Sequence, residues 1–499
     1  MVGTSHESEN YDRFTAKRIN FDQQENMSLQ LGSAQDQNAW SEGNQWTINS
    51  FFSRVNYTFA NKYVIEGTIR ADGSSRFDPD HRWGWFPGVN AAWRVGEEGF
   101  MKRLGWFEDL KVRASYGEMG NQSGIGLYDY IQLISLSNDY YPFGAGVKGQ
   151  MATSGNIIST SRTWETIQTT NVGFDFSTLN NRLYGSFDYF WKENKNMLIP
   201  KTYPSMLGAD APSTNSGHLS IHGWEISLGW RDQIKDFSYS VRFNISDAKN
   251  KVVDRVGSNL IKLGNNETPT GYPLNSYFGY EFDGIIQNEQ ELEAYKSRFS
   301  EGGIPGDLSV GDAMYKDLDG DGKLSVLGDG KEGSGDVKYL GDKNPRYNFG
   351  FNLSMAWKGF DLSAFIQGVG RRTMFLEGES RCPMPEAWYQ SAEYWYGKTW
   401  TPERTDAQYP AITLKDKRNY NYYVSTNTKF NVAYARLKNL QFGYTIPQTL
   451  TSKAGLQKVR VYFSGEDLFE VHNTPNGWDP EENSGSITSY PFTRNYSFG

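Results

Sequence analysis

Long segments with alternating apolar and polar side chains recur along this chain. In one of them, Tyr347 to Lys358, every second residue is a Tyr, Phe, Leu, Met or Trp. Successive side chains of a β-strand point to opposite faces, so this pattern predicts a strand with one apolar and one polar face. The same alternation occurs in residues 63–71, 224–231 and 237–246. The predicted strands run to about ten residues, whereas soluble strands usually have about five or six.

The composition excludes several classes of protein. Lys and Arg number 50 against 58 Asp and Glu, a net charge of −8 that argues against a nucleic-acid binder. A single cysteine, Cys382, excludes a disulfide scaffold and a cysteine-rich zinc module. No apolar run reaches the roughly 18 residues of a transmembrane helix, and the first residues do not resemble a signal peptide.

The organisation of the chain is uniform. We find no linker or charge block that divides it, so we expect one all-β body over residues 1–499. Alternating segments of about ten residues, with short turns at one end and long polar loops at the other, are typical of an outer-membrane barrel. Periodicity alone leaves a soluble β-sandwich or propeller open, in which the aromatic rings form the core.

A family resemblance rests on an ordered set of short motifs. The first are Arg70 to Phe77, then Arg82-Trp83-Gly84-Trp85-Phe86-Pro87, Ala92-Trp93-Arg94 and Leu110 to Gly117. Later ones are Asn215-Ser216-Gly217, Gly223-Trp224-Glu225, Tyr277 to Ile285, Tyr434 to Leu440 and Gly477-Trp478-Asp479-Pro480-Glu481. From about residue 50 onward the chain resembles SusC/RagA-type TonB-linked outer-membrane proteins.

The resemblance implies an antiparallel transmembrane β-barrel in the outer membrane. Such proteins import nutrients, typically oligosaccharides or peptides. A plug domain closes their barrel, a SusD-like surface lipoprotein covers the outer mouth, and TonB supplies energy. We expect no plug or TonB-contacting segment in this chain, and the family usually continues a few residues beyond Gly499. The expectation is therefore a partial barrel of roughly 15 or 16 strands out of about 22.

One acidic segment predicts a calcium site. In Asp317-Leu318-Asp319-Gly320-Asp321-Gly322-Lys323, carboxylates alternate and a glycine permits a sharp turn, as in the first half of an EF-hand loop. Asp317, Asp319, Asp321 and the Lys323 carbonyl are the candidate ligands for Ca²⁺. The twelfth position is Gly328 instead of Glu, so Asp329 or Asp336 would have to complete the set. The alternative is a solvated acidic turn.

Candidate substrate contacts come from the densest aromatic stretch, residues 386–400. Trp388, Tyr389, Trp395 and Tyr396 are rings that could stack on a sugar, or could form the packing of their own loop. We identify no catalytic or cofactor-binding residues and expect a transport protein, not an enzyme. The alternatives are a soluble glycan-binding protein and a glycoside hydrolase on a propeller. A propeller needs a blade repeat of about 40 residues, and the sequence shows none.

Overall fold

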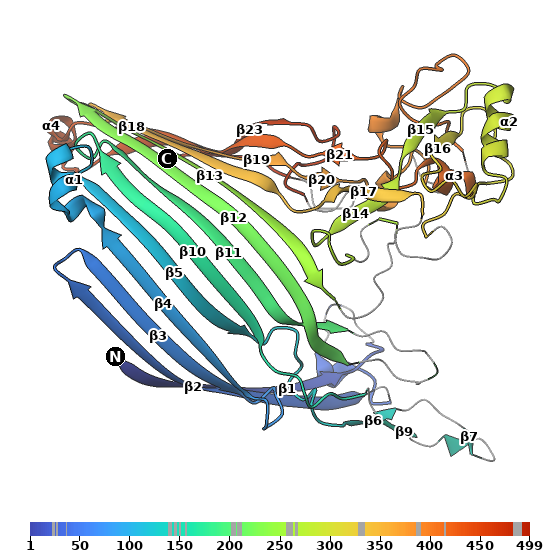
Figure 1. Ribbon diagram of the computed structural model, residues 1–499, viewed down its shortest axis with the longest axis horizontal. Helices are drawn as coiled ribbons and strands as arrows, with labels where there is room; N and C mark the ends of the chain where they lie inside the picture. Colours follow the sequence, from blue (N-terminus) through green and yellow to red (C-terminus); the bar gives the residue numbers. More distant parts are fainter. Residues whose placement is uncertain are drawn as a thin grey trace.

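The fold is one large, curved antiparallel sheet with loops gathered at one end (Figure 1). The structure is a computed structural model, and it describes residues 1–21, 25, 28–35, 37–137, 142–143, 147–148, 151–154, 157–200, 206, 212–255, 263–264, 268–327, 335–385, 391–413, 416–482 and 492–499. Every pair of neighbouring strands in this sheet is antiparallel, as the barrel interpretation requires.

The sheet has 14 strands among the described residues, which is fewer than expected. The long loops between β13 and β18 and between β19 and β22 contain many residues that the expectation had assigned to further strands. In order, the strands are β1 (Val2–Lys17), β2 (Asn38–Phe59), β3 (Tyr63–Ser74), β4 (Trp83–Arg94), β5 (Asp109–Asn121), β10 (Glu165–Thr178), β11 (Leu183–Pro200), β12 (Ser213–Ile234), β13 (Phe237–Asp254), β18 (Arg346–Trp357), β19 (Phe360–Arg371), β22 (Tyr434–Thr445), β23 (Arg460–His472) and β24 (Asn495–Phe498).

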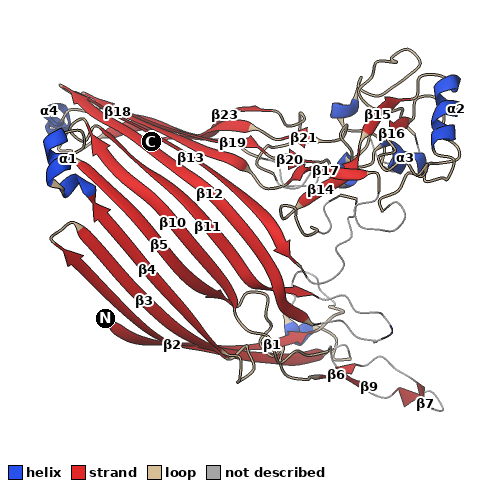
Figure 2. Ribbon diagram, in the orientation of Figure 1, coloured by secondary structure: helices blue, strands red, loops and turns tan. Residues whose placement is uncertain are grey.

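Short elements lie at both ends of the sheet (Figure 2). Two-stranded ribbons form from β14 (Ser276–Tyr280) with β17 (Val337–Asp342), β15 (Phe282–Ile285) with β16 (Ala313–Tyr315), β20 (Thr373–Met374) with β21 (Phe430–Asn431), β6 (Ile134–Ser137) with β9 (Met151–Ser154), and β7 (Pro142–Phe143) with β8 (Val147–Lys148). The α-helices are α1 (Gly99–Leu104), α2 (Glu289–Arg298), α3 (Asp416–Asn421) and α4 (Gln448–Thr451). No helix in the described part of the chain is long and apolar enough to cross a membrane.

At the end opposite the long loops, tight hairpins connect several neighbouring strands, and longer segments that carry α1 and α4 join β4 to β5 and β22 to β23 (Figure 1). Between β2 and β3, Ala60 and Asn61 have φ of 50° and 56°, and between β18 and β19, Lys358 and Gly359 have φ of 45° and 91°. Two consecutive positive φ values are the signature of a type I′ hairpin, whose twist matches that of the flanking strands. The short turns and the long loops therefore lie at opposite ends of the sheet, as the sequence predicted.

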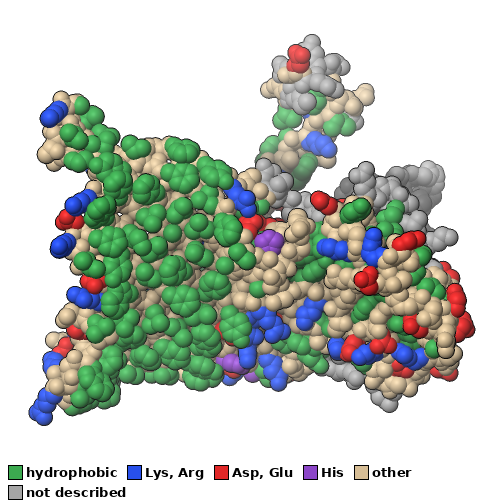
Figure 3. Space-filling model, turned by 90° about the horizontal axis from the view of Figure 1, so that it is seen from above, with side chains coloured by type: hydrophobic (Ala, Val, Ile, Leu, Met, Phe, Trp, Pro, Cys, Tyr) green, Lys and Arg blue, Asp and Glu red, His purple; other side chains and the backbone are tan. Residues whose placement is uncertain are grey.

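The strands with alternating apolar and polar side chains expose their apolar face. The alternating segments predicted from sequence lie within β3, β12, β13 and β18, except that Lys358 belongs to the turn. On this face Val55, Ile65 and Phe442 are 67%, 57% and 47% exposed. Figure 3 shows a broad field of hydrophobic side chains over the wall. A soluble sandwich or propeller would bury these faces against each other, so the exposed field fits a surface that lipid covers.

Aromatic rings line both margins of the apolar field. Near the short turns, Tyr63 stacks against Phe59 and Trp93, each with ring centroids 6.4 Å apart. Toward the loops, Phe51 stacks on Trp83 at 6.0 Å. Rings with one polar edge favour the boundary between lipid and water. The two margins match the aromatic girdles of a membrane-spanning barrel.

Several strands continue well past these margins. β2 and β12 each have 22 residues. At roughly 3.3 Å per residue such a strand is about 70 Å long, far more than a tilted strand needs to cross a bilayer. The upper parts of these strands therefore stand outside the hydrocarbon region and carry the loops.

Candidate functional site

The acidic loop predicted from sequence lies between β16 and β17. The carboxylate of Asp317 accepts hydrogen bonds from the backbone amides of Gly320 (2.7 Å) and Gly322 (3.1 Å). Both glycines adopt positive φ, 76° and 75°, so the backbone can wrap closely around this carboxylate. The carboxylate of exposed Asp319 accepts from the amide of Asp321 at 3.3 Å. The loop is thus a compact turn rich in oxygen atoms.

A distant acidic residue completes the cluster. One carboxylate oxygen from each of Asp317, Asp319 and Asp336 lies within 4.8 Å of the others. Asp336 is buried and accepts hydrogen bonds from the amides of Leu318 (2.7 Å) and Ser325 (2.8 Å). Desolvation, followed by repulsion between the neighbouring carboxylates, raises the pKa of both Asp319 and Asp336. Three hard oxygen donors at this separation suit a divalent cation, which would relieve that repulsion.

The other predicted ligands lie outside this trio. The carboxylate of Asp321 accepts a hydrogen bond from the amide of Lys323 at 2.8 Å, so it caps its own turn. Lys323 forms an isolated bridge with Gly302. Asp329 lies outside the described residues. Asp336, one of the two residues considered as a completing ligand, is therefore the one that the structure places beside Asp317 and Asp319.

A tyrosine-rich core holds the acidic loop in place. The Tyr295 and Tyr420 hydroxyls are 2.6 Å apart, and the Tyr295 hydroxyl also accepts from the amide of Tyr315 at 3.0 Å. The Tyr315 hydroxyl donates to the Tyr420 carbonyl at 2.7 Å. Because Tyr420 belongs to the β19–β22 loop and Tyr295 and Tyr315 to the β13–β18 loop, these bonds join two loops into one packed unit. That unit is seen at the loop end of Figure 1.

The predicted aromatic contacts divide into different environments. Trp388 and Tyr389 lie outside the described residues. Trp395 is buried and packs on Tyr409 and Tyr422, with ring centroids 4.8 Å and 5.5 Å away. Tyr396 is 89% exposed at the loop surface. The structure therefore gives Trp395 a packing environment and leaves Tyr396 as the described ring that a ligand could reach.

Burial also defines the state of the single cysteine. Cys382 lies in the same apolar cluster as Trp395 and Tyr422. Burial raises the pKa of its thiol, which keeps the sulfur protonated and weakly nucleophilic.

The polar face of the sheet carries networks of ion pairs. Arg113 binds Asp175 and Asp188, with nitrogen–oxygen distances of 2.9 Å and 3.0 Å. Register places these groups opposite the apolar field, because Val112, Phe174 and Tyr189 occupy the alternate positions of the same strands. Charged pairs on this face match the water-facing interior of a barrel.

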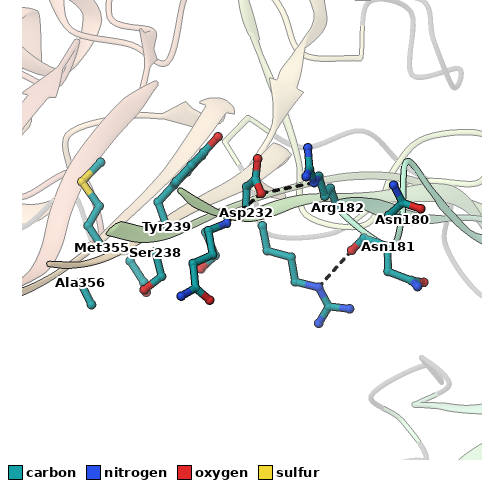
Figure 4. Close-up of a pocket in the computed structure, with 12 residues that line it drawn as sticks. Asn180, Asn181, Arg182, Asp232, Ser238, Tyr239, Met355 and Ala356 are labelled. Carbon is teal, nitrogen blue, oxygen red and sulfur yellow. Dashed lines mark hydrogen bonds and ion pairs between the residues drawn. The ribbon is translucent and has the colours of Figure 1, made fainter. Parts of the chain in front are cut away.

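A cavity of about 570 Å³ lies at the short-turn end of the sheet. Figure 4 shows the residues that line it, with Arg182 bonded to Asp232 and a second arginine reaching the Asn181 carbonyl. The Arg182–Asp232 distance is 3.3 Å, and the Arg231 Nε donates to that carbonyl at 3.1 Å. Guanidinium, amide and hydroxyl groups make the hollow suited to a polar partner.

Comparison with known proteins assigns the family. A sequence model described as "TonB dependent receptor-like, beta-barrel" matches residues 2–468. The chain belongs to this family. TonB-dependent receptors of this kind are outer-membrane β-barrel proteins, in agreement with the exposed apolar field and the two aromatic margins. The resemblance inferred from the sequence motifs is confirmed.

Curated relatives include TonB-dependent receptor P3 of Formosa agariphila and SusC of Bacteroides thetaiotaomicron. The first is 32% identical over 456 residues, covering 88% of this chain and 42% of the relative. SusC is 28% identical over 498 residues, covering 93% of this chain and 44% of SusC. The chain thus spans less than half the length of these TonB-dependent receptors.

Among solved structures, the RagAB peptide transporter has the same fold. The match has a TM-score of 0.78 at 22% identity and covers 99% of this chain and 52% of the other. A second structure, the RagAB peptide importer in a closed state, matches with the same TM-score at 23% identity. The partial antiparallel barrel inferred from sequence is therefore confirmed as a TonB-dependent receptor barrel.

The sequence did not reveal a buried arginine and a cationic cavity of this receptor barrel. Arg436 is fully buried and pairs with Glu470, Asp479 and Glu481. A cavity of about 400 Å³ near the tops of β12 and β13 is lined by several cationic side chains. The buried arginine left no local signal, because its partners come from β23 and from the loop that follows. For the cavity, Lys249 and Lys251 at alternate positions of β13 were a visible sign.

Proposed function

We propose that this chain forms most of the wall of an outer-membrane importer for nutrients, energised through TonB. The observation that carries the proposal is the two-sided sheet, with an exposed apolar field on one face and ion-pair networks on the other. A wall of this kind separates lipid from an aqueous passage. Because the chain belongs to the TonB-dependent receptor family, we propose TonB as the source of energy for import.

We propose that the complete importer has parts in addition to the strands of this sheet. Within the described residues, β1 and β24 each pair with a strand on one side only. Open sheet edges are not tolerated in hydrocarbon, so further strands of the protein would close the barrel. We propose that a plug domain fills the polar interior and contacts TonB, and that a SusD-like lipoprotein covers the loop end.

We propose oligosaccharides or peptides as the cargo. RagAB is described as a peptide transporter, and SusC is a TonB-dependent receptor. The exposed ring of Tyr396 at the loop surface suits stacking against a sugar or an apolar side chain. The polar interior suits hydrated cargo more than lipid.

Uptake by cells that make the intact receptor tests the function. We expect labelled oligosaccharides or peptides to accumulate in these cells, and accumulation to stop when TonB is deleted or the protonmotive force is collapsed. A deletion strain lacking the receptor is the control. Uptake that is equal with and without the receptor, for both classes of cargo, would contradict the proposal.

Replacing Tyr396 tests its role as a cargo contact. We expect Tyr396→Ala to weaken binding of the imported cargo by about 0.5–1.5 kcal/mol, or roughly two- to twelve-fold, because a stacked ring is lost. Isothermal titration with the intact receptor measures this. Trp106→Ala is the matched control, because Trp106 is also exposed (67%) but lies near the short turns. Equal affinity of both variants and the parent would remove Tyr396 from the site.

We also propose that Asp317, Asp319 and Asp336 bind Ca²⁺, with Asp321 and the Lys323 carbonyl shaping the loop around it. The proposal is supported by the 4.8 Å grouping of carboxylate oxygens and by the two glycines that allow the turn. The ion would stiffen the packed loop unit and would take no part in chemistry.

A chelator experiment tests the calcium proposal. We expect calcium to slow proteolysis of the loop in the parent protein, and Asp319→Ala to abolish the difference between calcium and chelator. Limited proteolysis followed by mass spectrometry locates the cleavage. Asp307→Ala, in the same loop but outside the carboxylate trio, should retain the calcium effect. Identical cleavage of the parent with calcium and with chelator would show that the trio is an ordinary acidic turn.

A further inference from the structure

The apolar field ends, toward the loops, in a border of Lys, Arg and His side chains, as Figure 3 shows. Side chains of these types occur at the upper part of β12 and β13. Lys249 and Lys251 are both exposed there. They line the cavity of about 400 Å³ together with His222, Arg346 and Arg371. We refer to this cavity as the cationic border cavity.

Strand register places the two lysines on the lipid side of the wall. Pairing of β13 with β12 is regular from Phe237 to Val252, and the register shift occurs only beyond it. Side chains alternate strictly along a regular strand, so Lys249 and Lys251 share the face of Phe243 and Ile245. The two lysines therefore extend the row of lipid-facing side chains of β13 toward the loop end.

The height of the lysines corresponds to the headgroup layer. Lys249 pairs across the sheet with His222, which pairs with Trp191, a 46% exposed ring that packs on Tyr189 at the loop end of the apolar row of β11. Lys251 is about 7 Å farther along the strand. The headgroup layer on each side of the hydrocarbon core is about 5–8 Å thick. Both ammonium groups thus fall where lipid headgroups lie, and their flexible stems can reach either way.

The charge of the cavity is not balanced by the carboxylates that line or adjoin it. Asp247 is already bound by Arg346, with one nitrogen–oxygen distance of 2.5 Å. Asp342 accepts from the Tyr339 hydroxyl at 2.7 Å and from the amide of Asn344 at 3.0 Å. Across the described part of the chain, no ion pair involves Lys249, Lys251 or Arg371. Lys249 and Lys251 therefore present to the membrane surface positive charge that has no ion-pair partner among the described residues.

We propose that the cationic border cavity binds a phosphate group on a lipid headgroup of the outer leaflet. Ammonium and guanidinium groups pair strongly with phosphate oxygens, and cationic pockets at the level of the headgroups are suited to phosphorylated lipids. The proposal goes beyond nutrient import, because it concerns the lipid-facing side of the wall. It requires the loop end to face the cell exterior.

Lipid binding to the purified protein tests the proposal. The intact receptor in neutral detergent is titrated with fluorescent bis-phosphorylated lipid A and with its dephosphorylated form. We expect the parent to prefer the phosphorylated lipid, and Lys249→Gln/Lys251→Gln to bind it roughly 30-fold more weakly, from about 1 kcal/mol for each lysine. Affinity for the dephosphorylated lipid should be the same for both proteins.

A matched control and a competitor complete the experiment. Lys453→Gln/Lys458→Gln makes the same change in charge near α4, at the opposite end of the wall, and should bind like the parent. All variants should share the thermal unfolding midpoint of the parent, which separates binding from folding. Equal affinity of the parent for both lipids would overturn the proposal. Displacement of the lipid by inorganic phosphate at equal concentration would assign the cavity to free phosphate and would also overturn it.

Discussion

Arg436→Ala should lower the free energy of unfolding of the intact receptor by about 3–5 kcal/mol. The side chain of Arg436 is fully buried, and its nitrogens lie 2.9 Å, 2.6 Å and 3.0 Å from carboxylate oxygens of Glu470, Asp479 and Glu481. Its guanidinium also lies 4.2 Å from the centre of the Phe492 ring. Removing the cation leaves Asp479 without its guanidinium partner, and leaves Glu470 and Glu481 with only the more exposed Arg494 and Lys438.

Arg494→Ala is the matched control for this loss. Arg494 also binds Glu470, at 3.1 Å, but its side chain is 47% exposed. Exposed ion pairs contribute about 0–1 kcal/mol, so this variant should unfold close to the parent. Urea unfolding in detergent micelles, followed by tryptophan fluorescence, gives both values. If the two substitutions cost the same, the buried network does not hold the β22–β23 region together.

The membrane-spanning part of the fold was predictable because lipid imposes a strict pattern. In β13, Phe237, Tyr239, Val241, Phe243 and Ile245 alternate with Ser, Arg and Asn. Only one face of a strand can meet hydrocarbon, so alternation predicts both the strand and its orientation. The same rule identified β3, β12 and β18.

The upper strands were harder to predict because both of their faces meet water. The top of β12 includes Thr214, Asn215, Ser216 and Ser220. Without hydrocarbon on one side, nothing selects apolar residues at every second position, and the sequence there resembles a loop. The structure extends β12 to Ser213 by backbone pairing with β11. Pairing of this kind leaves little trace in a single sequence.

Long-range convergence also lay beyond sequence reasoning. Asp336 meets Asp317 and Asp319 because the segments that carry them, after β16 and before β17, lie together in the loop region. The first half of the acidic motif was visible because its glycines and carboxylates are adjacent. Tyr295 and Tyr420 are 125 positions apart, so no local sequence pattern could predict their hydrogen bond. Adjacent residues in the sequence thus predicted the site, whereas tertiary packing determines which carboxylates form it.

Placing a charge on the apolar field should sharply disfavour folding in the membrane. Leu228 lies on this field between Trp224 and Trp230 of β12 and is 42% exposed. We expect Leu228→Arg to destabilise the folded barrel by up to about 2–4 kcal/mol, the cost of an arginine at the bilayer midplane. At 1.4 kcal/mol for each factor of ten, the ratio of folded to unfolded protein falls roughly 30- to 700-fold.

The adjacent residue provides the control that makes this test specific. Ser227 precedes Leu228 and points to the polar face, where it pairs across the sheet with Ser186 and Asn244. Ser227→Arg adds the same side chain one position away, in water, and should cost less than about 1 kcal/mol. Folding into lipid vesicles, followed by protease protection, compares the two variants. Equal losses, or a greater loss for Ser227→Arg, would mean that lipid does not cover the apolar field, and the importer proposal would fail with it.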